Sequence, residues 1–267
     1  MDYAAVLVVE ALLHRSARPP LTVVGPNAHL VTMADRDNRF AAAMADADLA
    51  VPDGISVVIA SRALGIPIPE RVTGGDLMER MCAEAAHYGL RVFFLGGLPG
   101  AAVLAAEHLR AKYPTLHVCG TCCPPLGFEH DPAELERIRT EIAAAAPDLI
   151  CVAFGAPKQE IWMQENRGHL HVGAIMAVGA ALDTQAGLRR RAPQGFQSLG
   201  LEWLFRLCME PRRLWRRYLI GNARFGLLVC RQWARERFEA IRRKGADWLQ
   251  NFDSNEVQTI RISHEED

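Results

Sequence analysis

The sequence predicts an α/β fold built on a mainly parallel sheet and followed by a basic helical segment. Apolar runs of strand length alternate with helix-like segments through the first 193 residues, which is the pattern of strand–helix units packed into one sheet. After Pro193 the strand-like runs stop, and arginine and tryptophan become frequent. We therefore predict a Rossmann-like α/β domain over residues 1–193 with helices flanking its sheet, a helical C-terminal appendage over residues 194–250, and a tail over residues 251–267.

The strands and helices are predicted from runs of apolar residues and from the turn residues between them. The expected strands span residues 21–25, 48–51, 91–95, 116–120, 148–154 and 172–178. The expected helices span residues 28–46, 76–88, 101–113, 132–146 and 158–166, another begins near Ile55, and a loop covers residues 179–191. Gly89 is placed to end one helix and Pro132 to begin another. Parallel strands bring the following loops to one edge of the sheet, where ligands bind in such folds.

The charge of the chain is unevenly distributed. The formal net charge is −1, whereas residues 195–244 contain twelve basic and four acidic residues, so this window is strongly positive. Such a division indicates a surface directed at an anionic partner. Trp215, Tyr218, Leu219, Asn222 and Phe225 fall on one helical face, with arginines around the remainder. We interpret this as amphipathic helices that lie in a membrane interface, against the alternatives of an arginine-rich structural cap or a nucleic-acid patch.

The sequence shows no signal peptide and no apolar run of the length that spans a bilayer. Seven cysteines without a secretion signal fit reduced thiols in a cytoplasm. The C-x-x-C spacing of Cys119 and Cys122 lacks a second ligand pair for zinc. We therefore expect a cytoplasmic protein without a metal or other cofactor.

Polar residues follow several of the predicted strands. Asp53 lies in a Pro-Asp-Gly turn after the second strand, and Asn27 follows the first. A turn role is the common reading of such residues, and catalysis is the alternative. Arg71 with the segment Thr73-Gly74-Gly75-Asp76 could bind a phosphate or cap a helix, with Asp76 as the simplest N-cap.

Two further turns carry residues suited to binding a phosphate. The turn at Gly96 and Gly97 could bring backbone amides to a pyrophosphate, although its glycines do not have the G-x-G-x-x-G spacing. Lys158, Gln159 and Glu160 place a cation, an amide and a carboxylate at the start of a helix. A basic loop at residues 189–191 is expected at the same edge of the sheet.

These motifs occur in an order that resembles the WecG/TagA/CpsF glycosyltransferase family over about residues 21–218. The ordered motifs are Asp53-Gly54, Arg71-Val-Thr-Gly74-Gly-Asp76-Leu77, Phe94-Leu-Gly96-Gly97-Leu-Pro99-Gly100, Gly155-Ala-Pro157-Lys158-Gln159-Glu160, Gly179-Ala-Ala-Leu-Asp183, Ala186-Gly187, Arg191-Ala-Pro193, Gly200-Leu-Glu202-Trp203-Leu-Phe-Arg206-Leu, Glu210-Pro211-Arg212-Arg213 and Arg216-Arg217-Tyr218. Each motif is short, but the ordered set is specific.

The resemblance implies an enzyme that transfers a hexose from a UDP-sugar to a polyprenyl-pyrophosphate-linked saccharide, with inversion, in bacterial surface polysaccharide synthesis. The hexose is of the N-acetylmannosamine, uronate or glucose type. The resemblance also implies that Asp53 is the general base, that Asn27 belongs to its pocket, and that Arg71 and Gln159 line the site. The arginine-rich appendage is then expected to bind an anionic membrane, peripherally at the inner face of the plasma membrane, and to complete the site.

The remaining candidate residues are assigned to the substrate or to the membrane. Donor binding is expected of Gly96, Gly97, Lys158, Glu160, Asp183 and Arg191, with a loop-orienting role as the alternative for Asp183 and Glu160. Contact with the membrane or acceptor is expected of Arg206, Arg212, Arg213, Arg216 and Arg217. No D-x-D pair lies at a strand end, so a metal-independent reaction is predicted.

One position departs from the family pattern. The family usually has a threonine two residues before the asparagine, where this chain has Gly25. The hydroxyl of that threonine is then missing here, or Thr22 or Thr32 supplies it. Two other classes compete with the transferase: a nucleotide-dependent oxidoreductase on a doubly wound sheet, and a non-catalytic membrane adaptor. The glycine spacing speaks against the oxidoreductase.

Overall fold

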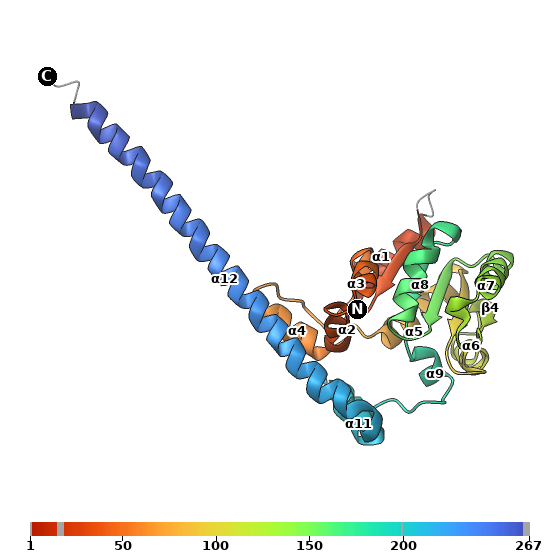
Figure 1. Ribbon diagram of the computed structural model, residues 1–267. Helices are drawn as coiled ribbons and strands as arrows, with labels where there is room; N and C mark the ends of the chain where they lie inside the picture. The colour runs from red at the N-terminus through yellow and green to blue at the C-terminus, as the bar shows by residue number, and fades with distance from the viewer. Residues whose placement is uncertain (1, 15–18, 199, 264–267) are drawn as a thin grey trace.

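A parallel sheet forms the centre of the molecule (Figure 1). The computed structural model describes residues 2–14, 19–198 and 200–263. Within them the strands are β1 (Leu21–Val24), β2 (Leu49–Ala50), β3 (Arg91–Gly96), β4 (His117–Cys122), β5 (Leu149–Ala153) and β6 (Ala174–Ala177), in the order β2-β1-β6-β5-β3-β4. All five pairings of neighbouring strands are parallel. The predicted fold class is therefore confirmed.

Helices cover both faces of the sheet, and each face has its own apolar core. The helices α1 (Asp2–Leu13), α5 (Gly74–Tyr88), α6 (Ala101–Lys112) and α9 (Ala181–Gln185) contribute to one core. The helices α3 (Asn38–Ala45), α7 (Pro132–Ala145) and α8 (Lys158–Asn166), with the short helix η1 (Phe128–His130), contribute to the other. The strands between them are buried on both sides, as parallel strands usually are.

The helix predicted over residues 28–46 is two helices. The chain forms α2 (Ala28–Ala34) and then α3, with the break at residues 35–37. The side chain of Asp37 accepts hydrogen bonds from the backbone N–H groups of Arg39 and Phe40, at 3.0 and 3.1 Å. Asp37 is therefore the N-cap that starts a new helix, and this cap signal outweighs the continuous apolar pattern.

Two α-helices of the described residues, α1 and α9, were not predicted. In α1, the buried residues Ala4, Ala5, Val8, Val9 and Leu12 recur at helical spacing and pack on the sheet and on α5. That spacing is a signal the sequence carries. The loop predicted over residues 179–191 contains α9, whose five residues are too few to show a period.

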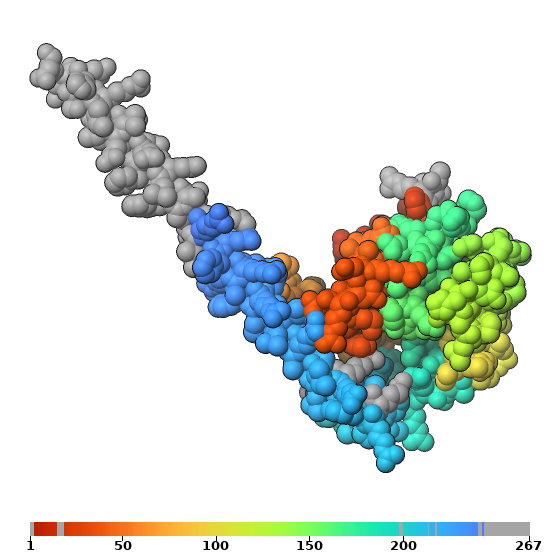
Figure 2. All heavy atoms as spheres, in the orientation of Figure 1, coloured from red at the N-terminus to blue at the C-terminus, as the bar shows by residue number. Residues whose placement is uncertain are grey.

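The C-terminal part is helical, as predicted. It consists of α10 (Gln194–Ser198), α11 (Glu202–Met209) and α12 (Pro211–Ser263), so the last helix continues into the segment predicted as a tail. At 1.5 Å per residue, α12 is about 80 Å long. Figure 1 shows it passing α2 and α4 (Ile55–Ala63) and continuing away from the sheet, and Figure 2 shows its described surface as an arm beside the domain.

One residue of the helical face predicted to meet a membrane is buried against the α/β domain instead. Leu214 and Phe225 are buried, and Phe225 packs against Ala28 of α2 and Ala60 of α4. Trp215 and Leu219 are 42% and 63% exposed. Contact with α2 and α4 turns Phe225 towards the domain, so it does not belong to the exposed apolar face. None of the helices within the described residues is both long and apolar enough to cross a membrane.

Candidate active site

The loops after β1 and β2 place Asp53 beside Asn27. The backbone N–H of Asp53 donates to the carbonyl of Pro26 at 3.0 Å, and the N–H of Val51 donates to the carbonyl of Val24 at 2.9 Å. A third bond, from Val72 N–H to the Pro52 carbonyl at 3.0 Å, joins the segment after Arg71 to the same turn. Three stretches of chain that are far apart in sequence therefore meet at the carboxyl edge of β1 and β2.

Asn27 has two functions in this arrangement. Its Oδ1 accepts the backbone N–H groups of His29 and Leu30, at 3.1 and 3.2 Å, and so caps α2. Its side chain also makes a hydrogen bond with Asp53 that lowers the pKa of that carboxyl. Because Oδ1 is directed at the helix, the amide NH₂ is the group that donates to Asp53.

The carboxyl group of Asp53 has a pKa raised to about 7. Burial is the largest cause, because a low-polarity environment disfavours the charged form. Arg206 and Arg71 oppose it by attracting the carboxylate, and Glu202 adds to it by repulsion. The residue keeps part of its surface exposed. A carboxyl with a pKa near neutrality, in a residue that is partly exposed, is suited to accept a proton from a substrate.

Arg71 is held by the appendage. Its Nη1 lies 2.6 Å from Oε2 of Glu202, and its Nη2 donates to the carbonyl of Gln197 at 3.2 Å. Arg191 pairs with Asp76, and its Nε lies 3.9 Å from Oε1 of Glu202. Glu202 thus links α11 to two arginines of the α/β domain, and the predicted binding residues Arg71 and Arg191 lie in one network with it.

Glu202 was not predicted as a site residue on its own. It lies one helical turn before Arg206 in a strongly basic segment, and an isolated acid among arginines is the signal that could have identified it. Asp76 is not the N-cap of α5, contrary to the prediction. Thr73 has that position: its Oγ1 accepts the N–H of Asp76 at 3.1 Å and donates to the Asp76 carboxylate at 2.7 Å. Asp76 is thereby left with one oxygen for Arg191.

The turn after β3 is shaped by its glycines and held by Asp183. Gly96 and Gly97 have φ values of 99° and 85°, which residues other than glycine rarely adopt. A Cβ at Gly96 would lie 2.8 Å from the ring of Phe154. Asp183 accepts the N–H of Leu98 at 2.8 Å and pairs with Arg189 at 3.1 Å. These contacts fit the loop-orienting alternative for Asp183.

The three residues that begin α8 point in different directions. Lys158 pairs with Glu129 of η1. Gln159 accepts the N–H groups of Gly155 and Gly179, the second residues after β5 and β6, at 3.2 and 3.1 Å. Glu160 is buried and accepts a hydrogen bond from Gln159 at 2.8 Å. Gln159 therefore lies at the edge of the sheet predicted for the site, whereas Lys158 and Glu160 interact with neighbouring protein groups.

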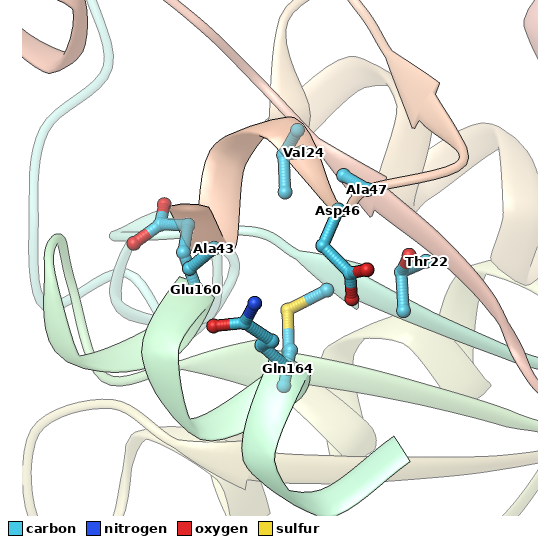
Figure 3. Close-up of a pocket in the computed structure, with 8 residues that line it drawn as sticks. Thr22, Val24, Ala43, Asp46, Ala47, Glu160 and Gln164 are labelled. Atoms are coloured by element: carbon cyan, nitrogen blue, oxygen red, sulfur yellow. The ribbon is translucent and has the colours of Figure 1, made fainter. Parts of the chain in front are cut away.

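A cavity of about 10 Å³ lies between β1, α3 and α8, with Glu160 in its lining. Thr22, Asp46, Glu160 and Gln164 are among its lining residues, and Figure 3 shows Glu160 and Gln164 extending from α8 towards α3. The residues around Asp53 do not line it. Its volume suffices for about one water molecule, so it cannot hold a sugar nucleotide.

Neither threonine considered for the missing hydroxyl reaches Asp53. Thr22 exchanges hydrogen bonds with Asp48, and Thr32 donates to the carbonyl of His29 at 2.9 Å. Because both hydroxyls are used inside the fold, these contacts favour the other alternative, that the hydroxyl is missing here. Position 25 itself lies against the base: a Cβ there would be 3.1 Å from the Cβ of Asp53.

The described arginines of the appendage lie in different surroundings. Arg206 acts on Asp53 through its charge, although its side chain is exposed. Arg212 and Arg216 are exposed on α12, and Arg216 lies over the ring of Trp215 at 5.3 Å. The side chains of Arg213 and Arg217 lie outside the described part of the chain. Arg224 pairs with Asp35 and fastens α12 to the end of α2.

Comparison with known proteins identifies the class of this protein: it is a glycosyltransferase. The geometry of the site agrees with that class. A family model described as "Glycosyl transferase WecG/TagA/CpsF family" matches residues 1–239. The chain belongs to this family. It is also 33% identical over 198 residues, 74% of each chain, to a protein of Bacillus spizizenii (strain W23) named N-acetylglucosaminyldiphosphoundecaprenol N-acetyl-beta-D-mannosaminyltransferase. These findings favour the transferase over the oxidoreductase and adaptor alternatives.

Proposed function

We propose that this protein is an inverting glycosyltransferase that moves a hexose from a UDP-sugar to a polyprenyl-pyrophosphate-linked saccharide, with Asp53 as the general base. The observation that carries the proposal is the carboxyl of Asp53, with a pKa of about 7, beside Asn27 and within the field of Arg71 and Arg206. The name of the Bacillus relative suggests the substrates: a lipid-linked N-acetylglucosaminyl diphosphate as acceptor and N-acetylmannosamine as the sugar transferred.

In this mechanism Asp53 takes the proton from the attacking hydroxyl of the acceptor. The hydroxyl oxygen forms a bond to the anomeric carbon of the donor sugar on the face opposite the nucleotide. The bond from that carbon to the diphosphate oxygen breaks, UDP leaves with the electron pair, and the configuration inverts. Asp53 ends the step protonated, and general-base catalysis of this kind contributes about 10²- to 10⁴-fold.

Arginines and backbone amides supply the positive charge that the leaving diphosphate requires. Arg206 lies close enough to lower the pKa of Asp53, and Arg191 lies in the network around Glu202. The turn at Gly96 and Gly97 leads into α6, whose N-terminal amides favour an anion. Groups of this type stabilise charge where it develops in the transition state, and we propose that they do so without a metal ion.

The exposed surface of α11 and α12 is proposed to meet an anionic membrane at the cytoplasmic face. Trp203, Trp215, Leu219 and Ile220 are exposed there, and Arg212 and Arg216 lie among them. Aromatic and aliphatic side chains combined with arginine are typical of helices that lie in the interface. Arg206 in the same segment would bring the pyrophosphate of a lipid-borne acceptor close to Asp53.

The test combines a panel of donors with one substitution. Purified protein is incubated with a polyprenyl-diphosphate N-acetylglucosamine acceptor and UDP-linked N-acetylmannosamine, its uronate or glucose, with and without EDTA, and the elongated lipid is measured. Transfer from one donor is expected, unchanged by EDTA, and Asp53→Asn should lower kcat about 10²- to 10⁴-fold. Full activity of the Asp53→Asn variant would show that Asp53 is not the base. A loss of activity in EDTA would contradict a metal-independent reaction.

A further inference from the structure

Glu160 is a buried acid that the proposed mechanism does not use. The residue is 1% exposed. Its Oε1 accepts a hydrogen bond from the amide NH₂ of Gln159 at 2.8 Å, and its Oε2 has no hydrogen-bond partner among the described residues. Burial raises the pKa of its carboxyl. Its one hydrogen bond to a side chain of the described residues, with Gln159, is the contact through which Glu160 acts on its surroundings.

The only side chain that Glu160 contacts by a hydrogen bond within the described residues is Gln159, whose amide forms hydrogen bonds through both its nitrogen and its oxygen. Oε1 of Gln159 accepts two backbone N–H groups, from Gly155 and Gly179. A rotation of the amide by 180° would direct its NH₂ group at these two donors and its oxygen at the Glu160 carboxyl. Glu160 thus selects the orientation in which Gln159 can hold both loops.

The loop after β6 borders the Asp53 site, and Gln159 ties the loop after β5 to it. Gly155 and Gly179 are the second residues after β5 and β6, with φ values of 75° and 54°, so both turns use conformations that glycine favours. A Cβ at Gly74 would lie 3.4 Å from the carbonyl of Ala177, so the Arg71–Gly74 segment rests on the end of β6. The same segment is bonded to the turn of Asp53 through Val72. Movement of the Gly179 loop would therefore reach the base and Arg71.

We propose that Glu160 is a positioning residue: it fixes the Gln159 amide, which holds the loops after β5 and β6 in the arrangement that the transfer reaction requires. The inference rests on the proposed function for its kinetic part alone. It assigns Glu160 no contact with substrate, in place of the donor-binding role predicted from the motif.

The test uses the full chain and two substitutions of similar size. Glu160→Gln keeps an oxygen that can accept from Gln159, whereas Glu160→Met removes the acceptor and fills the same space. Hydrogen exchange of the peptides that contain Gly155 and Gly179 measures the hold on the loops directly. Faster exchange is expected in Glu160→Met and exchange close to wild type in Glu160→Gln.

Kinetics and stability separate positioning from folding. Glu160→Met should have an unfolding midpoint close to that of wild type, because methionine fills the same space, and yet lose about 10- to 100-fold in kcat/KM for the donor. Glu160→Gln should retain kcat/KM within about threefold, because its amide oxygen can still accept from Gln159 and the loops stay in place. A Met variant with unchanged loop exchange, or with unchanged kcat/KM, would overturn the proposal. If wild type transfers no sugar, the proposed function fails, but the exchange experiment still decides whether Glu160 holds the loops.

Discussion

At the scale of single residues, the base is defined by what surrounds it. Asp53 lies in a turn that is common in proteins, and its pKa of about 7 results from burial, two arginines, Glu202 and Asn27 together. The pKa of an aspartate in the unfolded chain is near 3.8. The folded protein therefore binds a proton at this position between about pH 4 and pH 7 that the unfolded chain has already released.

This difference predicts opposite effects of pH on activity and stability. In wild type, kcat/KM should fall about tenfold per pH unit below pH 7 and level off above it, because the base form is required. Ionisation of Asp53 destabilises the fold above pH 7 and has no effect below pH 4. Asp53→Asn should therefore raise the unfolding midpoint at pH 8 but not at pH 4, while activity is lost. A pH–rate profile that is flat from pH 5 to pH 8 would contradict this pKa.

Gly25 allows a second prediction at the same scale. Its φ is one that other residues adopt, so a methyl group should leave the backbone in place while pressing on the Cβ of Asp53 at 3.1 Å. Gly25→Ala should lower kcat/KM about tenfold through a small displacement of the base. Gly168→Ala is the matched control, because nothing lies within 4 Å of its added Cβ. Equal activity in both variants would show that position 25 does not affect Asp53.

At the scale of elements, α11 contributes two charges of opposite sign to Asp53. Arg206 lowers the pKa of the base and Glu202 raises it. Glu202 also accepts from Arg71, so it joins the appendage to the α/β domain as well. The position of one short helix thus affects the charge around the base. The appendage therefore contributes residues to the site as well as an exposed surface.

The two charges predict shifts of the activity profile in opposite directions. Glu202→Gln should move the acid limb of kcat/KM to lower pH, because it removes repulsion and frees Arg71 to attract the carboxylate. Arg206→Gln should move that limb to higher pH. Arg80→Gln, on α5, serves as the control and should leave the profile in place. Shifts of the same sign in the two α11 variants would rule out this electrostatic arrangement.

At the scale of the whole molecule, a nearly neutral chain carries a basic arm. The formal net charge is −1, yet exposed arginines and aromatic residues gather on α12. Attraction between exposed charges and an anionic surface weakens as salt screens it. The arm is therefore expected to hold the protein on anionic membranes at low salt and to release it as the salt concentration rises.

The membrane prediction is tested with the intact chain. Replacing Arg212 and Arg216 by glutamine should weaken sedimentation with phosphatidylglycerol vesicles by about 30-fold, at about 1 kcal/mol for each arginine. Binding of wild type should fall with added salt and be weak on neutral vesicles. Arg80→Gln should sediment as wild type does. Salt-independent binding, or an undiminished double variant, would refute an electrostatic role for these arginines.

Local patterns were sufficient to predict the six strands and most helices. Strand-length apolar runs, Gly89 after α5 and Pro132 at the start of α7 are signals that act over a few residues. The break between α2 and α3 and the helix α1 had such signals too, in the Asp37 cap and in the spacing of Val8 and Leu12. The site was predicted as a set of residues because its motifs share one edge of a parallel sheet.

The sequence alone therefore determined the fold class and placed Asn27 and Asp53 after parallel strands, since both follow from short-range periodicity and from parallel topology. Only the tertiary structure decided the pairings: Glu202 with Arg71, Gln159 with the Gly155 and Gly179 loops, and Phe225 with α2 and α4. The pKa of Asp53 also depends on burial and on charges up to 153 residues away in sequence, since Arg206 is one of its causes. Such effects act through space, and the spacing of residues along the chain does not record them.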